Sequence, residues 1–331
     1  MTIGFNIGQM QHFLAMSQKG NADLSSAQTK KIIENTPKDW LDNLRFSGTM
    51  SNTMNLSKIC YGEDENALML ALQLHKKLYP GLLDQLKLAV WALTGNDTAV
   101  LNNVKKKVPN SYLYNMRTAY QQLKSKNFYF TFNSHMPYLK RCTLDESLTS
   151  LKFVADNFNL KTVELENETY MSDYLTSGLK GNYEKNIDNY FLYLEKEVIP
   201  KILLLAGNIP LGISYCKPSN KMWKYWRLKA VDFATRMKRL EIDIFLVPHV
   251  YLDSTSDIEI IDTLSQELKD TAGHDVMITE FGTNSSAGKM SQDEEIDFIQ
   301  RFAHYAQIRG VKGVFKHTLF VPQSNHFSFI K

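Results

Sequence analysis

The chain has 331 residues, of which 44% are hydrophobic and 11% aromatic, enough to bury a large core in a single domain. Its 38 basic and 35 acidic residues are spread along the sequence and give a net charge of +3, so the charge pattern predicts no nucleic-acid partner. No apolar run is long enough to cross a bilayer, which argues against a membrane partner.

The cysteines and histidines point away from disulfide and metal chemistry. Cys60, Cys142 and Cys216 are far apart and odd in number, which suits reduced thiols. No pair of cysteines or histidines has metal-ligand spacing, so we expect no metal and no cofactor. No signal peptide is visible at the start. The compartment stays open between the cytoplasm and a component of a larger assembly.

Short β-rich runs alternate with amphipathic helical stretches along the chain. The candidate strands begin near Ile3, Asn43, Phe128, Thr162, Ile209, Ile242, Val276 and Val311. Helical patterns occupy residues 25–35, 112–126, 144–157, 184–206, 222–240, 257–271 and 292–309. Strands that alternate with helices indicate a parallel sheet, and eight strands close a (β/α)₈ TIM barrel. We therefore expect an α/β fold with one such barrel over residues 1–331.

Two intervals depart from the regular repeat. Strands two and three are about twice the usual distance apart, and two further helical patterns predict a helical insertion over about residues 57–110. After the eighth strand only residues 319–331 remain, too few for a full eighth helix. A missing or degenerate eighth helix exposes apolar surface on strands eight and one. We expect the insertion, the C-terminal tail or another protein chain to cover this seam.

Two glutamates close separate apolar runs. Glu168 ends the run 163–168, and Glu280 ends the run 275–280. A carboxylate at the end of a buried strand is costly unless it is solvated, paired or catalytic. The spacing assigns the glutamates to strands four and seven, whose ends share the C-terminal face of a barrel. The alternation over 163–168 also fits a half-exposed antiparallel strand, but the helices on both sides favour the barrel.

Two carboxylates in one site can divide the roles of acid and nucleophile in glycoside hydrolysis. Arg45 ends the second strand, and a nearby arginine lowers a carboxylate pKa. It therefore suits Glu280 as a neighbour, or forms a structural ion pair at the barrel mouth. Tyr251 could donate a hydrogen bond to Glu280 or cap its own strand. His249 and His135 suit packing or hydrogen bonding better than general-base catalysis.

Five short motifs resemble those of clan A (β/α)₈ retaining glycoside hydrolases. Residues 164–168, ELENE, resemble the E-L-G-N-E signature, and residues 278–282, ITEFG, match the I-T-E-[FW]-G strand. Residues 44–49, LRFSGT, resemble the L-R-F-G-G-T of the heparanase-type and β-glucuronidase branch. Residues 249–251, HVY, and residues 4–6, GFN, resemble its H-x-Y and G-x-N motifs.

The resemblance implies that Glu168 is the acid/base, Glu280 the nucleophile and Asn167 a ligand of the sugar 2-hydroxyl. Arg45 and Tyr251 would hold the nucleophile ionised. Trp223 follows a strand end, where its ring could stack on a sugar or belong to the core. The expected substrate-binding residues are thus Asn167, Arg45, Tyr251, His249, Asn6 and Trp223.

The chain departs from the family pattern at several positions. Glu166 replaces a glycine, which adds a carboxylate close to the site or packed under it. Thr169 stands where proline often follows the acid/base, and Ser47 replaces a second glycine. The eighth strand lacks the tryptophan that often floors the sugar site.

Three functions compete. The first is an enzyme that hydrolyses a glycosidic bond of a carbohydrate substrate with retention. The alternative is a catalytically weak or inactive barrel that serves as a structural or carbohydrate-binding component of a larger assembly. A barrel lyase or aldolase has only Lys316 in its favour. The sugar, the linkage, exo or endo action and the oligomeric state are left open.

Overall fold

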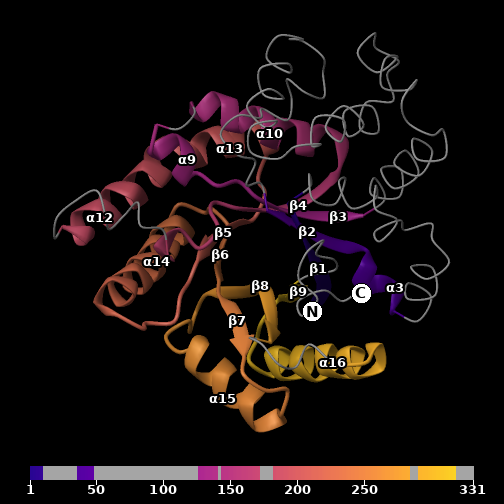
Figure 1. Ribbon diagram of the computed structural model, residues 1–331. Coiled ribbons are helices and arrows are strands. Elements are labelled where there is room, and N and C mark those ends of the chain that lie inside the picture. The colour runs from indigo at the N-terminus through magenta and orange to yellow at the C-terminus, as the bar shows by residue number, and fades with distance from the viewer. Residues whose placement is uncertain (10–35, 48–125, 141–142, 172–181, 284–289, 318–331) are drawn as a thin grey trace, which may run out of the picture.

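The computed structural model describes residues 1–9, 36–47, 126–140, 143–171, 182–283 and 290–317. In these residues a nine-stranded sheet has the order β6-β5-β4-β3-β2-β1-β9-β8-β7, with parallel pairings. A further pairing of β6 with β8 closes the sheet into a barrel (Figure 1). The strands are β1 (Thr2–Gln9), β2 (Asn43–Ser47), β3 (Asn127–Thr131), β4 (Asn159–Glu164), β5 (Leu211–Ser214), β6 (Ile244–Val247), β7 (His249–Leu252), β8 (Asp275–Thr283) and β9 (Gly313–His317).

The nine strands fill eight barrel positions, because β6 and β7 are two halves of one. Both halves pair with β8, and Pro248 separates them. Proline has no backbone N–H for the ladder, so it interrupts a strand that its neighbours continue. The (β/α)₈ prediction is therefore confirmed, with its sixth strand broken in the middle.

Helices pack around the outside of the sheet (Figure 1). They are α3 (Lys38–Leu41), α9 (His135–Tyr138), α10 (Leu144–Asn157), α12 (Tyr183–Tyr193), α13 (Ile199–Ala206), α14 (Lys221–Arg239), α15 (Asp257–Glu267) and α16 (Gln292–Ile308). A π-helical turn, η3 (Leu194–Val198), joins α12 to α13. Pro200 explains the wider turn, since its ring clashes with the carbonyl four residues back and removes a hydrogen bond.

The helices expected at 25–35 and 112–126 (apart from its last residue), the inserted helices at 57–110 and the C-terminal tail lie outside the described residues, so these expectations stay predictions. On β9, Val314 is fully buried in the main core. No helix among the described residues is both long and apolar enough to span a membrane.

The barrel interior is filled by large side chains. Tyr129, Phe245, Val247, Met277 and Phe315 form a buried cluster, with the rings of Tyr129 and Phe315 4.6 Å apart. Gly4 makes room for it: a Cβ there would lie 2.7 Å from the Phe315 ring and 2.5 Å from the carbonyl oxygen of Asn43. Only glycine permits this approach of β1 to its neighbours.

A register shift in β8 decides where Glu280 points. Between Ile278 and Phe281, two residues of β8 lie opposite Phe315 alone on β9. Ile278 and Phe281 both join the outer core, and Phe281 stacks on Phe302 of α16 at 4.1 Å. Strict alternation would have placed Glu280 on the same outer face as Ile278. The extra residue instead turns Glu280 toward the barrel mouth.

Candidate active site

Glu280 lies among three hydrogen-bond donors at the mouth of the barrel. Arg45 Nη1 lies 2.5 Å and Asn6 Nδ2 3.0 Å from Glu280 Oε1, and the Tyr251 hydroxyl donates to Oε2 at 2.7 Å. Burial alone would raise the pKa of Glu280. The charges of His249 and Arg45 outweigh burial and hold this pKa well below its usual range. Glu280 is therefore a carboxylate at any pH near neutral.

Arg45 of β2 is fully buried and joins strands that are not neighbours in the sheet. Its Nε and Nη2 donate to the two carboxylate oxygens of Glu164 at 2.7 and 2.6 Å, while Nη1 reaches Glu280. Thr131 donates to Glu164 Oε2 at 3.1 Å. The sequence left open whether Arg45 serves Glu280 or a structural pair, and the geometry shows that it contacts both. The sequence analysis did not identify Glu164 as a partner of Arg45, although Glu164 on β4 faces the barrel interior as Arg45 on β2 does.

Asn167 lies directly before Glu168 and is fixed by the same arginine. Its Oδ1 accepts a hydrogen bond from Arg45 Nη2 at 2.7 Å. This contact identifies which end of the amide is oxygen. The amide nitrogen of Asn167 is thereby left on the opposite side, where it can act as a donor.

Glu168 lies in the loop after β4. The strand ends at Glu164, four residues earlier than the run of the sequence suggested, and Glu168 adopts a left-handed conformation with φ 47°. Its carbonyl accepts from Met171 N at 2.8 Å and starts a 3₁₀ turn, η2 (Thr169–Met171). Glu280 also differs from the expectation of a strand end, since β8 continues to Thr283.

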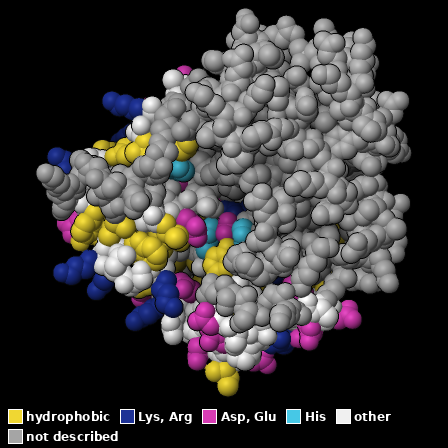
Figure 2. All heavy atoms as spheres, viewed as in Figure 1, with side chains coloured by type: hydrophobic (Ala, Val, Ile, Leu, Met, Phe, Trp, Pro, Cys, Tyr) yellow, Lys and Arg dark blue, Asp and Glu magenta, His cyan; other side chains and the backbone are white. Residues whose placement is uncertain are grey.

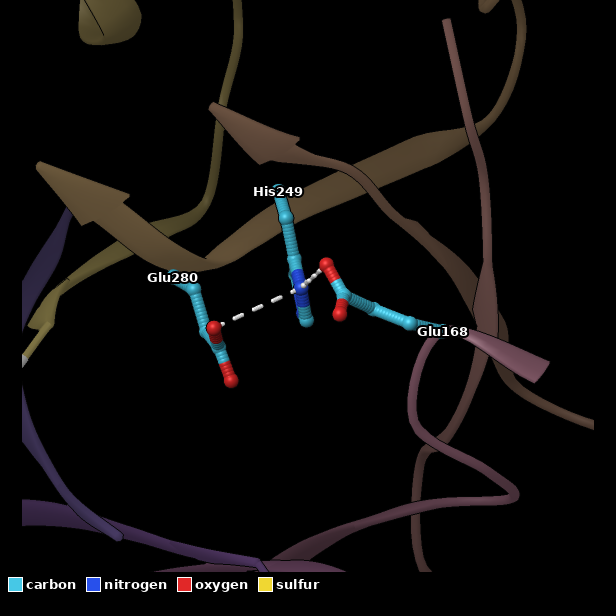
Figure 3. A group of neighbouring side chains, drawn as sticks. All are labelled: Glu168, His249 and Glu280. Atoms are coloured by element: carbon cyan, nitrogen blue, oxygen red, sulfur yellow. Dashed lines mark hydrogen bonds and ion pairs between the residues drawn. The ribbon is translucent and has the colours of Figure 1, made fainter. Parts of the chain in front are cut away.

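His249 of β7 lies between the two glutamates (Figure 3). Its Nδ1 is 2.9 Å from Glu168 Oε1 and 3.6 Å from Glu280 Oε2, and its Nε2 is 3.3 Å from Thr279 Oγ1. Burial would lower the pKa of His249, but the charge of Glu280 and the contact with Glu168 raise it overall. His249 thus links the two carboxylates electrostatically.

His317 at the end of β9 is a site residue that the sequence reasoning did not single out. Its Nδ1 lies 3.1 Å from Asn6 Nδ2 and 3.5 Å from Glu280 Oε2. Burial lowers the pKa of His317 to about 4, because the opposing charge of Glu280 does not offset it. A neutral ring can accept the Asn6 N–H at Nδ1. Asn6 itself is buried against Glu280.

Histidine and acidic side chains come to the surface together near the middle of this face of the molecule (Figure 2). Trp223, in the first turn of α14, does not contact Glu280 or Glu168 among the described interactions; its ring meets that of Tyr170 edge to face at 5.1 Å.

Glu166 is packed under the site, where it accepts hydrogen bonds from two backbone N–H groups, of Thr169 and Ser214. The second of the two alternatives for Glu166 is therefore correct.

One nitrogen or oxygen from each of Glu168, His249 and Glu280 lies within 4.8 Å of the others, a spacing that could hold a metal ion. The charges oppose this. Arg45 touches Glu280, and the raised pKa of His249 favours a proton where a metal would need a lone pair. We therefore assign no metal to these residues.

The sequence matches no known family model and no curated protein. Solved structures do match. They include an endo-1,4-β-D-mannanase from Thermotoga petrophila (9% identity, 95% of this chain and 87% of that chain, TM-score 0.44) and a xylanase from Cellvibrio japonicus (12%, 95% and 86%, 0.46). A β-glucuronidase from Bacteroides uniformis also matches (10%, 94% and 30%, 0.43).

These matched proteins are glycoside hydrolases, the class that the motifs resemble. At these identities, and with TM-scores below 0.5, no family, residue role or substrate passes from them to this chain. The heparanase-type branch stays a prediction from the motifs.

Proposed function

We propose that the protein hydrolyses a glycosidic bond with net retention, with Glu280 as nucleophile and Glu168 as acid/base. The observation that carries the proposal is the pairing of two carboxylates in unequal surroundings. An oxygen of Glu168 lies within 4.8 Å of one of Glu280. Retaining enzymes hold their carboxyl groups about 5 to 5.5 Å apart, whereas inverting enzymes leave about 6.5 to 9.5 Å for a water.

The surroundings divide the roles. Glu280 has a side chain only 10% exposed, with Arg45, Tyr251 and Asn6 fixing its two oxygens. A nucleophile must be anionic and held in line, and these contacts supply both conditions. The side chain of Glu168 is 29% exposed and meets His249. An acid/base has to reach first the leaving oxygen and then a water, which suits the more open carboxyl.

The chemistry then runs in two displacements. Glu280 attacks the anomeric carbon while Glu168 protonates the leaving oxygen, so a glycosyl ester forms as the glycosidic bond breaks. Glu168, now ionised, takes a proton from water, and the hydroxide displaces Glu280 from the sugar. On the acid side, a hydrogen bond of 2.9 Å joins Glu168 Oε1 to His249 Nδ1, so the proton for the leaving oxygen lies between these two atoms.

Two further residues are proposed to contact the carbohydrate. Asn167 has its amide oxygen tied to Arg45, so its N–H groups can donate to the sugar 2-hydroxyl. Trp223 is partly buried against the main core and contacts Tyr170, two residues after Glu168. We propose that its ring stacks on the sugar or aryl group that departs.

The test is a panel of aryl glycosides assayed with the wild type and with Glu280→Gln, Glu168→Gln and Glu267→Gln variants. We expect Glu280→Gln to abolish turnover and Glu168→Gln to slow poor leaving groups most, since activated leaving groups need little protonation. Glu267→Gln removes another buried carboxyl and should leave the rates unchanged. A 2-deoxy-2-fluoro glycoside should label Glu280, as read by mass spectrometry.

Full activity of Glu280→Gln would refute the mechanism. A wild type that hydrolyses no glycoside but binds sugars would instead favour the alternative, a carbohydrate-binding component of a larger assembly.

A further inference from the structure

Glu166 stands out because it is a buried ionisable group that the proposed reaction does not use. The residue is 1% exposed, and burial raises the pKa of its carboxyl. The two oxygens accept one backbone N–H each: Oε1 from Ser214 at 2.8 Å and Oε2 from Thr169 at 3.0 Å. A carboxylate with two charge-assisted hydrogen bonds to the backbone fixes both segments firmly.

The Ser214 contact replaces a missing rung of the sheet. β4 and β5 pair as far as Leu165, whose N–H donates to the carbonyl of Gly212 at 2.8 Å. The next rung would join Ser214 N to the carbonyl of Leu165. That carbonyl instead accepts from the backbone N and the hydroxyl of Ser134, at 2.9 and 2.6 Å. Glu166 Oε1 therefore satisfies an N–H that would otherwise be buried without a partner.

The Thr169 contact closes the turn that carries Glu168. Glu166 lies three residues before Thr169, the first residue of η2, and caps this turn in the way that an N-cap side chain caps a helix. Glu168 lies inside the closed loop, in the left-handed conformation that few non-glycine residues adopt. Something must hold it there, and the two bonds of Glu166 anchor the loop to β5.

We propose that Glu166 is a positioning residue that sets the place of the acid/base, Glu168, by tying its turn to β5. This inference rests on the proposed glycosidase function for its kinetic consequences. Glu166 touches no reacting atom, so it acts through Glu168 and not on the sugar.

The variants are Glu166→Gln and Glu166→Gly. Glutamine keeps the volume but presents an NH₂ to one of the two backbone donors, whereas glycine, which the resembling motif carries here, removes both contacts. The matched control is Glu267→Gln, which removes a buried carboxyl at the end of α15. If Glu166→Gly does not fold, Glu166→Gln carries the test alone.

For substrates with poor leaving groups, kcat/KM should fall about 10- to 100-fold, less than the roughly 10²- to 10⁴-fold that general acid catalysis supplies. Activated aryl glycosides should lose much less, and Glu267→Gln should show no such dependence on the leaving group. A uniform loss over all leaving groups would overturn the proposal, since it would mean general destabilisation.

A second readout needs no activity. His249 Nδ1 is hydrogen-bonded to Glu168 Oε1. Displacement of Glu168 should therefore lower the pKa of His249, by about one unit, because a nearby acidic group is lost. Histidine NMR titration of the wild type and the variants measures this change. An unchanged His249 pKa in Glu166→Gly would overturn the positioning role. A wild type inert on all glycosides would sink the proposed function, while the NMR result would still decide the role of Glu166.

Discussion

At the scale of single residues, the groups around Glu280 are themselves held by other partners. Arg45 is fixed by Glu164, and Asn6 contacts the ring of His317. Such second contacts leave each donor little freedom to follow another acceptor, so the site is organised before substrate arrives. Glu168 is held differently: its carboxyl meets His249, and its backbone is anchored through Glu166.

Tyr251→Phe should weaken the nucleophile without disturbing the fold. The tyrosine pKa lies well above 10, so the phenol keeps its proton and donates to Glu280. A hydrogen bond to a charged group contributes about 1.5 to 3 kcal/mol, so we expect kcat/KM to fall about 10- to 100-fold. Because that bond lowers the Glu280 pKa, the acidic limb of the pH profile should move to higher pH.

Tyr225→Phe is the matched control for this variant, since Tyr225 donates to the carboxylate of Asp188 at 3.0 Å away from the barrel mouth. Its activity should equal that of the wild type. An unmoved acidic limb in Tyr251→Phe would show that the phenol does not tune Glu280.

The two histidines beside Glu280 should have pKa values on opposite sides of the usual 6.5, the value for His317 below it and the value for His249 above it. His317 should change charge near pH 4, and His249 above its usual value. NMR titration of the ring carbons, assigned with His249→Gln and His317→Gln, measures both. The stability contributed by His249 is present below pH 6.5 and is lost as pH rises through its folded pKa. His317 instead destabilises the fold as pH falls from 6.5 to 4. Two rings titrating near 6.5 would contradict the described contacts.

At the scale of elements, the last residue of α15 is Glu267, a buried glutamate whose ionised carboxyl destabilises the folded state. Glu267 is buried, and its Oε2 has no hydrogen-bond partner among the described residues. Burial raises the pKa of Glu267 to about 7, although Lys217 and Arg227 act against the shift. A carboxyl with a raised folded pKa favours the unfolded state once the pH exceeds the unfolded value.

Glu267→Gln should therefore stabilise the protein at high pH and not at low pH. Below pH 4.5 the carboxyl is protonated in both states, so the variant and the wild type should unfold alike. Above pH 7 the variant should gain about 1 to 3 kcal/mol in free energy of unfolding. Urea denaturation at pH 4 and pH 8 measures the difference. A gain of equal size at both pH values would show that the charge of Glu267 is not the cause.

Among the described residues, local patterns were enough to predict most helices and strands but not how these elements meet. The helix expected at 144–157 is α10, and the eight strand positions follow the apolar runs, because both periodicities are properties of short segments. The break at Pro248 was also readable in principle. The register shift that turns Glu280 inward could not be read from the sequence, since alternation alone places Glu280 on the same outer face as Ile278.

The candidate site was predicted in part for the same reason. Motif resemblance brought together Glu168, Glu280, Arg45 and Tyr251, which do lie in contact or close to it. Glu164 and His317 were missed because their roles depend on which strands face each other across the barrel. That pairing is set by the closure of the sheet, which no single segment encodes.

At the scale of the whole molecule, Arg45 connects parts of the barrel that the backbone does not. It lies on β2 and bonds to Glu164 on β4 and to Glu280 on β8, strands separated from β2 by one or more others. One buried cation thus lies between two buried carboxylates. The fold and the ionisation of the proposed nucleophile depend on the same guanidinium.

Arg45→Met should destabilise the entire barrel in a pH-dependent way. Removing one partner of a buried pair costs about 3 to 5 kcal/mol, because the remaining charges stay buried. Arg236→Met, which breaks an exposed pair with Glu195 at 3.3 Å, should cost at most about 1 kcal/mol. Without Arg45 the pKa of Glu280 rises in the folded state, so a low pH relieves part of the destabilisation of the variant. In the wild type, the stability from the lowered pKa of Glu280 is present above about pH 4.5 and is lost as pH falls. Both effects reduce the difference in free energy of unfolding between wild type and variant at low pH. Urea denaturation at pH 4 and pH 7.5 measures this difference. A gap that does not change with pH would mean that Arg45 stabilises the barrel by packing and not by charge.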